Sequence, residues 1–160
     1  MHKRAKDLIN ELSLQPHPEG GYFREIFRSP HQVHRLDERS ARSALTTIYF
    51  LLIKGQHGRW HRVASDEAWH FYEGDPLDVY WIDGQDVVHQ EVLGTGSSDA
   101  HPVCVVPAGC WQAARPRGEY SLMGCTVAPG FEFRDFEMLS EESAALAHIR
   151  SLGATLAELA

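Results

Sequence analysis

Hydrophobic positions repeat with a helical period at both ends of the chain and with the period of strands between them. Near the N-terminus, Ala5, Leu8, Ile9 and Leu12 follow the i, i+3, i+4, i+7 spacing. This spacing predicts a short amphipathic helix that ends before Pro16. At the other end, a second apolar stripe predicts a C-terminal helix that is broken near Gly153, with apolar positions at Ala145, Ile149, Leu152, Leu156 and Leu159.

The middle of the chain consists of short runs rich in Val, Ile, Tyr, Phe and Trp, separated by Gly, Pro, Asp and Ser. These runs predict strands over residues 21–28, 45–52, 57–62, 68–72, 77–82, 87–92, 103–106, 110–114, 120–127 and 132–137. Many short strands at close spacing are typical of a β-sandwich or barrel. Because no repeat or linker interrupts the pattern, residues 1–160 are predicted to form a single, mainly β domain.

Composition narrows the classes of function. The chain has 160 residues and a formal net charge of −7, with 22 acidic and 15 basic side chains, which argues against a nucleic-acid partner. Cys104, Cys110 and Cys125 are odd in number and lack a metal-binding spacing, so we expect free thiols in a reducing compartment. The sequence shows no signal peptide and no apolar stretch long enough to cross a bilayer. We therefore expect a cytoplasmic protein without a membrane partner.

Two groups of residues resemble the motifs of the cupin superfamily. The spacing of the first cupin motif is matched by Gly55, His61, Glu67 and Gly74, while Val63 stands where that motif has a second histidine. Pro107 and Gly109 match the second motif, in which Gln112 takes the place of a metal-binding histidine. Together with the strand-rich pattern, these motifs favour a double-stranded β-helix, the cupin jelly roll, with a short N-terminal and a C-terminal helix.

A longer resemblance covers most of the chain. The segments 16–25, 60–72 and 121–133 are similar to the Cupin_5 family, most of whose members have no assigned activity. The resemblance implies a small homodimeric jelly roll with a pocket inside the barrel, similar in shape to the dTDP-4-keto-6-deoxyhexose epimerases. It implies a fold more directly than a reaction.

A metal site is one hypothesis for the pocket. Catalytic cupin metals usually bind three histidines and a glutamate, but the matched positions here hold His61, Val63, Glu67 and Gln112. Valine cannot bind a metal, and an amide oxygen is a weak ligand for transition metals. His57 has the same strand parity as His61 and would complete a set of His57, His61, Glu67 and Gln112. We expect no cofactor, and a divalent transition metal at these residues is the alternative.

A metal-free acid–base site is the second hypothesis. A carboxylate at Glu67 would orient the His61 imidazole and make it a general base next to a carbonyl group. In the epimerases that this fold resembles, a histidine base paired with a carboxylate works with a tyrosine acid on a keto-sugar. The candidate acids are Tyr72 and Tyr120, and the sequence does not select between them.

Other residues are candidates for contacts with a substrate. Tyr22 and Arg24 share one strand face, and an arginine in the pocket would bind a carboxylate or phosphate, which predicts an anionic ligand. Trp111 would stack on a ring beside Gln112. The irregular polar segment 29–43 is either a surface loop or a lid over the site.

The sequence thus predicts a homodimeric cupin that binds a small polar metabolite, such as a sugar or nucleotide-sugar, and acts as an epimerase or isomerase. Two alternatives stay open. One is a non-catalytic domain that binds or senses a small molecule, and the other is a metal-dependent cupin oxygenase or isomerase.

Overall fold

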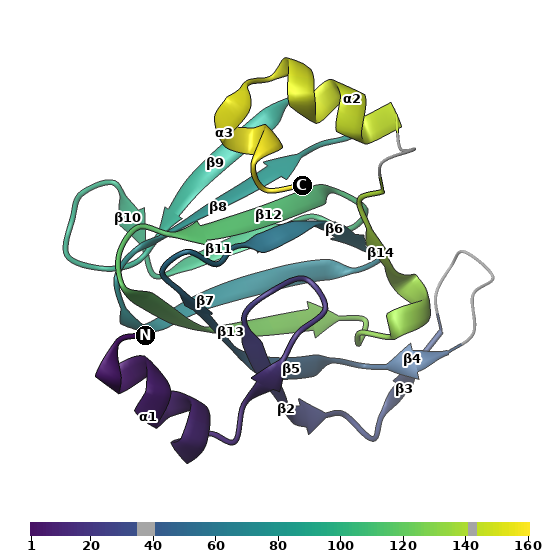
Figure 1. Ribbon diagram of the computed structural model, residues 1–160. Coiled ribbons are helices and arrows are strands. Elements are labelled where there is room, and N and C mark those ends of the chain that lie inside the picture. The colour runs from purple at the N-terminus through teal and green to yellow at the C-terminus, as the bar shows by residue number, and fades with distance from the viewer. Residues whose placement is uncertain (35–40, 141–143) are drawn as a thin grey trace.

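Two six-stranded sheets form the body of the protein in a computed structural model that describes residues 1–34, 41–140 and 144–160 (Figure 1). The first sheet has the order β1 (Gln15–Pro16), β2 (Tyr22–Arg28), β5 (Thr46–Ile53), β13 (Tyr120–Ala128), β7 (Asp66–Gly74) and β11 (Val103–Val106). The second has the order β10 (Ala100–His101), β9 (Val88–Leu93), β8 (Leu77–Ile82), β12 (Trp111–Pro116), β6 (Gly58–Val63) and β14 (Phe136–Met138). Neighbouring strands in these sheets are antiparallel except β9 and β10.

The main core lies between the two sheets. Alternate residues of each strand point inward, so Phe50 and Leu52 on β5, Trp69 on β7 and Val79 on β8 pack in one buried cluster. The predicted free thiols of Cys104, Cys110 and Cys125 are confirmed and belong to the same cluster. Burial of these apolar side chains holds the two sheets face to face.

Helices cover the outer sides of the sheets (Figure 1). The amphipathic helix α1 (Lys3–Glu11) packs Ala5 and Leu8 in a cluster with Leu51 of the first sheet. Helices α2 (Ala144–Ser151) and α3 (Ala154–Ala157) lie over the second sheet, and a cluster there joins Ile149 to Trp60. The predicted break at Gly153 is confirmed, since Gly153 has a φ of 128° between the two helices.

The mainly β class and the terminal helices are as predicted, and the strand positions agree to within about two residues at most ends. The segment 132–137 differs, because Phe133–Asp135 forms the 3₁₀ turn η1 and only Phe136–Met138 pairs with β6. In the polar segment 29–43, β3 (Gln32–Val33) pairs with β4 (Arg42–Ser43), while residues 35–40 lie outside the described residues. No helix in the described ranges is long and apolar enough to span a membrane.

Candidate functional site

A cavity of about 80 Å³ lies between the sheets, where β2, β5, β6, β7 and β13 contribute inward-facing side chains. Most of its wall is apolar and aromatic, and its phenylalanines are Phe23, Phe50, Phe131, Phe133 and Phe136. Its polar groups are carboxyl groups, imidazoles and an arginine, contributed chiefly by His17, Glu19, Arg28, His61 and Glu67. An enclosed site that combines an apolar wall with a few converging polar groups is the usual form of a small-molecule pocket.

The turn before β2 carries Glu19 into this cavity. Gly20 has a φ of 116°, and a Cβ there would lie 2.3 Å from the carbonyl oxygen of His57. Gly21 is equally close to the backbone of Leu51. Only glycine permits this conformation and this contact, so the turn packs tightly and Glu19 is buried.

His61 of β6 is the partner of Glu19. The Nδ1 atom of His61 lies 2.7 Å from the carbonyl oxygen of Arg59, which can only accept, so Nδ1 carries the proton. The Nε2 atom lies 3.1 Å from the Glu19 Oε2 atom. Burial lowers the pKa of His61 to about 4 and raises that of Glu19 well above its usual value. Glu19 is therefore a carboxylic acid that donates to a neutral imidazole.

His17 is the second histidine near Glu19, and its Nδ1 atom lies 3.7 Å from the same Glu19 Oε2 atom. Its Nδ1 atom accepts a hydrogen bond of 3.3 Å from the backbone N–H of Glu19. Its ring meets Phe23 edge-on at 4.5 Å. Burial, together with the charge on His61, lowers the pKa of His17 to about 4, so this imidazole is also neutral at physiological pH.

Glu67 of β7 is held by a separate buried chain of hydrogen bonds. The Gln112 amide donates to the Glu67 Oε2 atom at 2.6 Å and accepts from the Trp69 indole at 3.2 Å. The Cys125 thiol hydrogen-bonds the same carboxyl group. Burial raises the pKa of Glu67 to about 7. The carboxyl group is thus close to equal populations of its two charge states at neutral pH.

The predicted pair of His61 and Glu67 is not formed, since no hydrogen bond or ion pair joins the two among the described residues. Both side chains do line the same cavity. Gln112, predicted as a substrate contact, is instead fully buried behind Glu67, which it positions. The carboxyl group that holds His61 is Glu19, which lies more than forty residues earlier in the chain.

One wall of the cavity is the segment 130–138, which we call the strap. It follows β13 and contributes Phe131, Phe133 and Phe136, whose rings meet at centroid distances of 5.1, 5.8 and 6.1 Å. Their steep interplanar angles are those of edge-to-face packing. The strap also donates a backbone hydrogen bond of 2.7 Å, from the Gly130 N–H to the carbonyl oxygen of Ser43.

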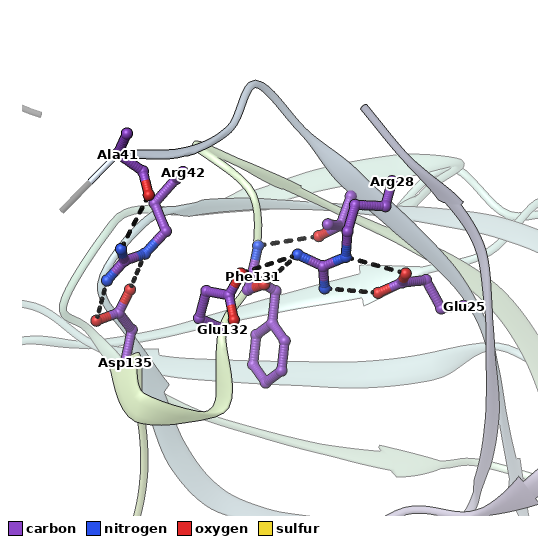
Figure 2. Close-up of polar contacts among 8 residues, drawn as sticks. Glu25, Arg28, Ala41, Arg42, Phe131, Glu132 and Asp135 are labelled. Carbon is purple, nitrogen blue, oxygen red and sulfur yellow. Dashed lines mark hydrogen bonds and ion pairs between the residues drawn. The ribbon is translucent and has the colours of Figure 1, made fainter. Parts of the chain in front are cut away.

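Two arginines tie the strap to the first sheet and the β4 segment (Figure 2). Arg28 donates to both oxygens of Glu25 at 3.1 and 2.8 Å, and to Glu132 and the Phe131 carbonyl at 3.1 Å each. Arg42 makes a bidentate ion pair with Asp135 at 2.8 and 3.0 Å. The Arg28 group is partly exposed at the cavity mouth, whereas the Arg42 pair is largely buried.

Tyr22 and Arg24 point away from the cavity. Tyr22 packs with the cluster under α1, and the Arg24 guanidinium lies 6.0 Å from the ring centroid of Tyr49. On β2 the residues that line the cavity are Phe23, Glu25 and Arg28. Arg24, expected to contact a ligand in the barrel, therefore does not line the cavity, because strand alternation puts this side chain on the opposite face.

The two candidate tyrosine acids also lie outside the cavity. Tyr72 is half-exposed on the outer face of the first sheet, where its ring meets Tyr49. The Tyr120 hydroxyl donates to Glu73 at 2.8 Å, near α1. Burial raises the pKa of both phenols. Neither tyrosine is among the residues that line the cavity with His61.

Trp111 and His57 are separated from the cavity as well. The guanidinium of Arg62 lies 4.8 Å from the Trp111 ring centroid, on the side of the strand opposite to Gln112. His57 precedes β6 and is partly buried, and its pKa is lowered by burial and by the charges of Arg59 and Arg115. His57 does not line the cavity.

The residues at the cupin metal positions do not fit a metal. The His61 ring is bonded on both nitrogens, and the Gln112 amide is bonded to Glu67 and Trp69. Val63 lines the cavity with an apolar side chain. In residues 1–34, 41–140 and 144–160, no group of three or more histidine, cysteine or acidic side chains is placed to hold an ion. The set of His57, His61, Glu67 and Gln112 is not assembled.

Sequence reasoning did not select His17, Glu19, Arg28 or the strap phenylalanines. A signal for the first two was present, because both polar residues, His17 and Glu19, come shortly before the double glycine Gly20–Gly21. A buried acid beside a turn that only glycine allows is a common way to bring a polar group to a site. The strap gave no such signal, since its rings also fit the pattern of a strand.

Two facing sheets with a cavity between them and helices at both ends of the chain define a cupin-type jelly roll. The sequence profile of the Cupin_5 family, described as Cupin superfamily (DUF985), matches residues 6–139. The chain belongs to this family.

Known relatives extend this result. The chain is 30% identical over 154 residues to an uncharacterized protein of Saccharomyces cerevisiae, covering 86% of this chain and 76% of that protein. The solved structure of a protein from Shewanella oneidensis has a TM-score of 0.85 and 35% identity, covering 98% of this chain and 96% of its own. Oxalate decarboxylase from Bacillus subtilis has a TM-score of 0.60 at 17% identity, covering 89% of this chain and 35% of its own. That last likeness is one of fold alone.

Proposed function

We propose that the cavity binds a small metabolite and that its buried carboxyl groups move a proton on it, as in an isomerase or epimerase. The observation that carries the proposal is the pair of buried acids on the cavity wall, Glu19 and Glu67, held by different hydrogen-bond networks. Acid–base sites typically contain two titratable groups whose different surroundings make one the acid and the other the base.

Glu67 is the general base of this proposal. Its pKa of about 7 leaves enough ionised carboxylate to accept a proton and enough basicity to remove one from a carbon beside a carbonyl group. In this step the C–H bond breaks, the proton moves to Glu67, and the electron pair forms the enol. Gln112 and Cys125 hold the carboxyl group in place.

Glu19 is the acid in place of a tyrosine. Its proton, shared with the His61 Nε2 atom at 3.1 Å, would move to the carbonyl oxygen as the enol forms. In an α-hydroxycarbonyl compound the intermediate is an enediol. Delivery of the Glu67 proton to the former carbonyl carbon, with loss of the neighbouring hydroxyl proton to Glu19, completes an isomerisation without any other reactant. His61 acts as a positioning residue for Glu19, because its other nitrogen is anchored on the backbone.

The cavity volume limits the group that reacts. A cavity of about 80 Å³ is far below the volumes of roughly 300 Å³ and more that enclose drug-sized ligands. A nucleotide-sugar therefore does not fit inside, and the sugar proposal is restricted to a small compound or to the reacting end of a larger one.

The experiment is a search for bound and exchanging compounds. Native mass spectrometry of the untagged protein identifies any retained compound. The protein is then incubated in D₂O with that compound and, separately, with each member of a panel of small hydroxy- and amino-carbonyl compounds. We expect deuterium to enter the carbon beside the carbonyl group. The variant Glu67→Gln should lower the exchange rate by about a hundredfold or more.

The matched control is Glu119→Gln, which removes one charge from an exposed pair with Lys54. It should exchange at the wild-type rate. Equal rates in wild type and Glu67→Gln would contradict the role of Glu67. If a compound binds in the cavity but exchanges no proton, the result would contradict catalysis and support a binding or sensing domain.

A further inference from the structure

We propose that the ligand of this cavity is a small organic cation, such as an alkylammonium compound. The inference rests on the proposed function in one respect, namely that the cavity binds a ligand. It reverses the charge predicted from the sequence, which depended on an arginine inside the pocket. Three features of the described chain support it: the position of the arginine, the partners of Glu67 and the aromatic wall.

The positive charge at the cavity is already matched. Among the described residues, Arg28 is the only arginine or lysine that lines the cavity. Its guanidinium lies at the mouth and contacts the carboxylates of Glu25 and Glu132 (Figure 2). The three side chains together therefore carry more negative than positive charge. An anion would have to displace one of these carboxylates before it could reach Arg28.

Within the described part of the chain, Glu67 has no charged partner. The acids at the mouth each contact an arginine, whereas the contacts of Glu67 come from the neutral Gln112 amide and the Cys125 thiol. A buried carboxylate is costly unless an opposite charge lies nearby. A cationic ligand would supply that charge inside the cavity, while an anionic ligand would add a second negative charge.

The aromatic wall favours the same ligand. The faces of aromatic rings carry negative electrostatic potential and attract ammonium groups within about 6 Å of the ring centroid. Five phenylalanines line the cavity, and the three of the strap lie at steep angles to one another, so their faces do not share one direction. The formal net charge of −7 also favours the approach of cations over anions.

Three probes with the same branched alkyl body separate charge from shape: isobutylammonium, isobutanol and isobutyrate. Each is titrated into the full chain at about pH 8, where Glu67 is mostly ionised and an alkyl amine remains protonated, and binding is followed by two-dimensional amide NMR. We expect isobutylammonium to bind about tenfold tighter than isobutyrate, with isobutanol between them. The shifts should be largest near Glu67, Cys125 and the strap.

Two variants complete the test. Glu67→Gln keeps the shape and the acceptor for Gln112, and it should remove most of the preference for the ammonium probe. Glu119→Gln lowers the total negative charge equally and should keep the preference. Tighter binding of isobutyrate or equal binding of the probes would overturn the proposed cation while leaving a binding cavity. A preference that survives in Glu67→Gln would overturn the role of Glu67 as the partner of the cation. If no probe shifts any cavity amide, the proposed function fails as well.

Discussion

Buried titratable residues of this cavity fall into two classes that respond oppositely to pH. Burial raises the pKa of Glu67 to about 7, and it lowers those of His17 and His61 to about 4. In each case the neutral form is favoured, because a charge inside an apolar wall loses its hydration. The carboxyl group therefore costs stability as the pH rises, and the imidazoles cost stability as the pH falls.

Glu67 gives a prediction at this scale. Between its ordinary pKa of 4.5 and its folded pKa of about 7, the folded protein keeps a proton that the unfolded chain has lost. The stabilising effect of the raised pKa is complete below pH 4.5 and is lost as the pH rises to 7. Glu67→Gln does not titrate, so its stability relative to wild type should improve by on the order of 3 kcal/mol between pH 4.5 and 7.5.

Urea denaturation at several pH values in this window measures the difference. The variant Glu119→Gln, whose carboxylate is exposed, should keep a nearly constant difference from wild type over the same range. A constant difference for Glu67→Gln as well would contradict a raised pKa at this residue.

Among the elements, the strap is the one that most directly shapes the cavity. It combines three phenylalanine rings that line the cavity with contacts to Arg28 and Arg42. The contacts differ in burial, since the Arg42 side chain is 2% exposed and the Arg28 side chain is 36% exposed. This difference decides how much each contact contributes, because exposed ion pairs are screened by water and buried ones are not.

Removal of the buried pair should therefore be the more damaging change. Asp135→Asn removes the negative charge from the largely buried bidentate ion pair with Arg42 and should lower the free energy of unfolding by about 3 kcal/mol. Glu132→Gln removes the same charge from the exposed contact with Arg28 and should cost less than about 1 kcal/mol.

Chemical denaturation of the two variants under the same conditions compares them directly. Both substitutions are isosteric and lie on the same segment, so a general effect of charge would appear in both. Equal losses of stability in the two variants would show that the buried pair does not stabilise the strap more than the exposed contact does.

At the scale of the whole molecule, the outer face of the first sheet exposes apolar side chains. Val103 and Val105 on the edge strand β11 point away from the core, opposite to Cys104 and Val106. Tyr72 of β7 is exposed on the same sheet. A long exposed apolar edge strand invites pairing with another chain, and a second copy of this chain is the partner that the sequence predicts.

The dimer prediction is tested with a charge in this face. Val105→Glu should shift the protein towards monomer in sedimentation equilibrium, because a carboxylate would be buried at a symmetric contact twice. Val87→Glu places the same charge on a similarly exposed valine before β9, in the other sheet, and should leave the mass unchanged. A wild-type protein that is monomeric, or a Val105→Glu variant that remains dimeric, would contradict this interface.

The sequence by itself determined the strands and the terminal helices, because alternation and helical periods are local properties. The jelly roll was predicted from the resemblance to the cupin motifs. It also singled out His61 and Glu67, both of which line the cavity. Which side chains of β2 face the cavity could not be predicted from alternation alone. A bulge between Glu25 and Phe27 changes the alternation, so Arg28 faces the cavity with Glu25 while Arg24 faces outward.

The tertiary structure decided which groups meet. Glu19 reaches His61 because the Gly20–Gly21 turn packs against the backbone of β5 and of residue His57, a contact between distant parts of the chain. Gln112 holds Glu67 because β12 and β7 face each other across the core, in different sheets. A spacing motif predicts which strand a residue belongs to and which face of the sheet it occupies. The partner across the cavity depends on register and on the packing of the two sheets, which no local pattern contains.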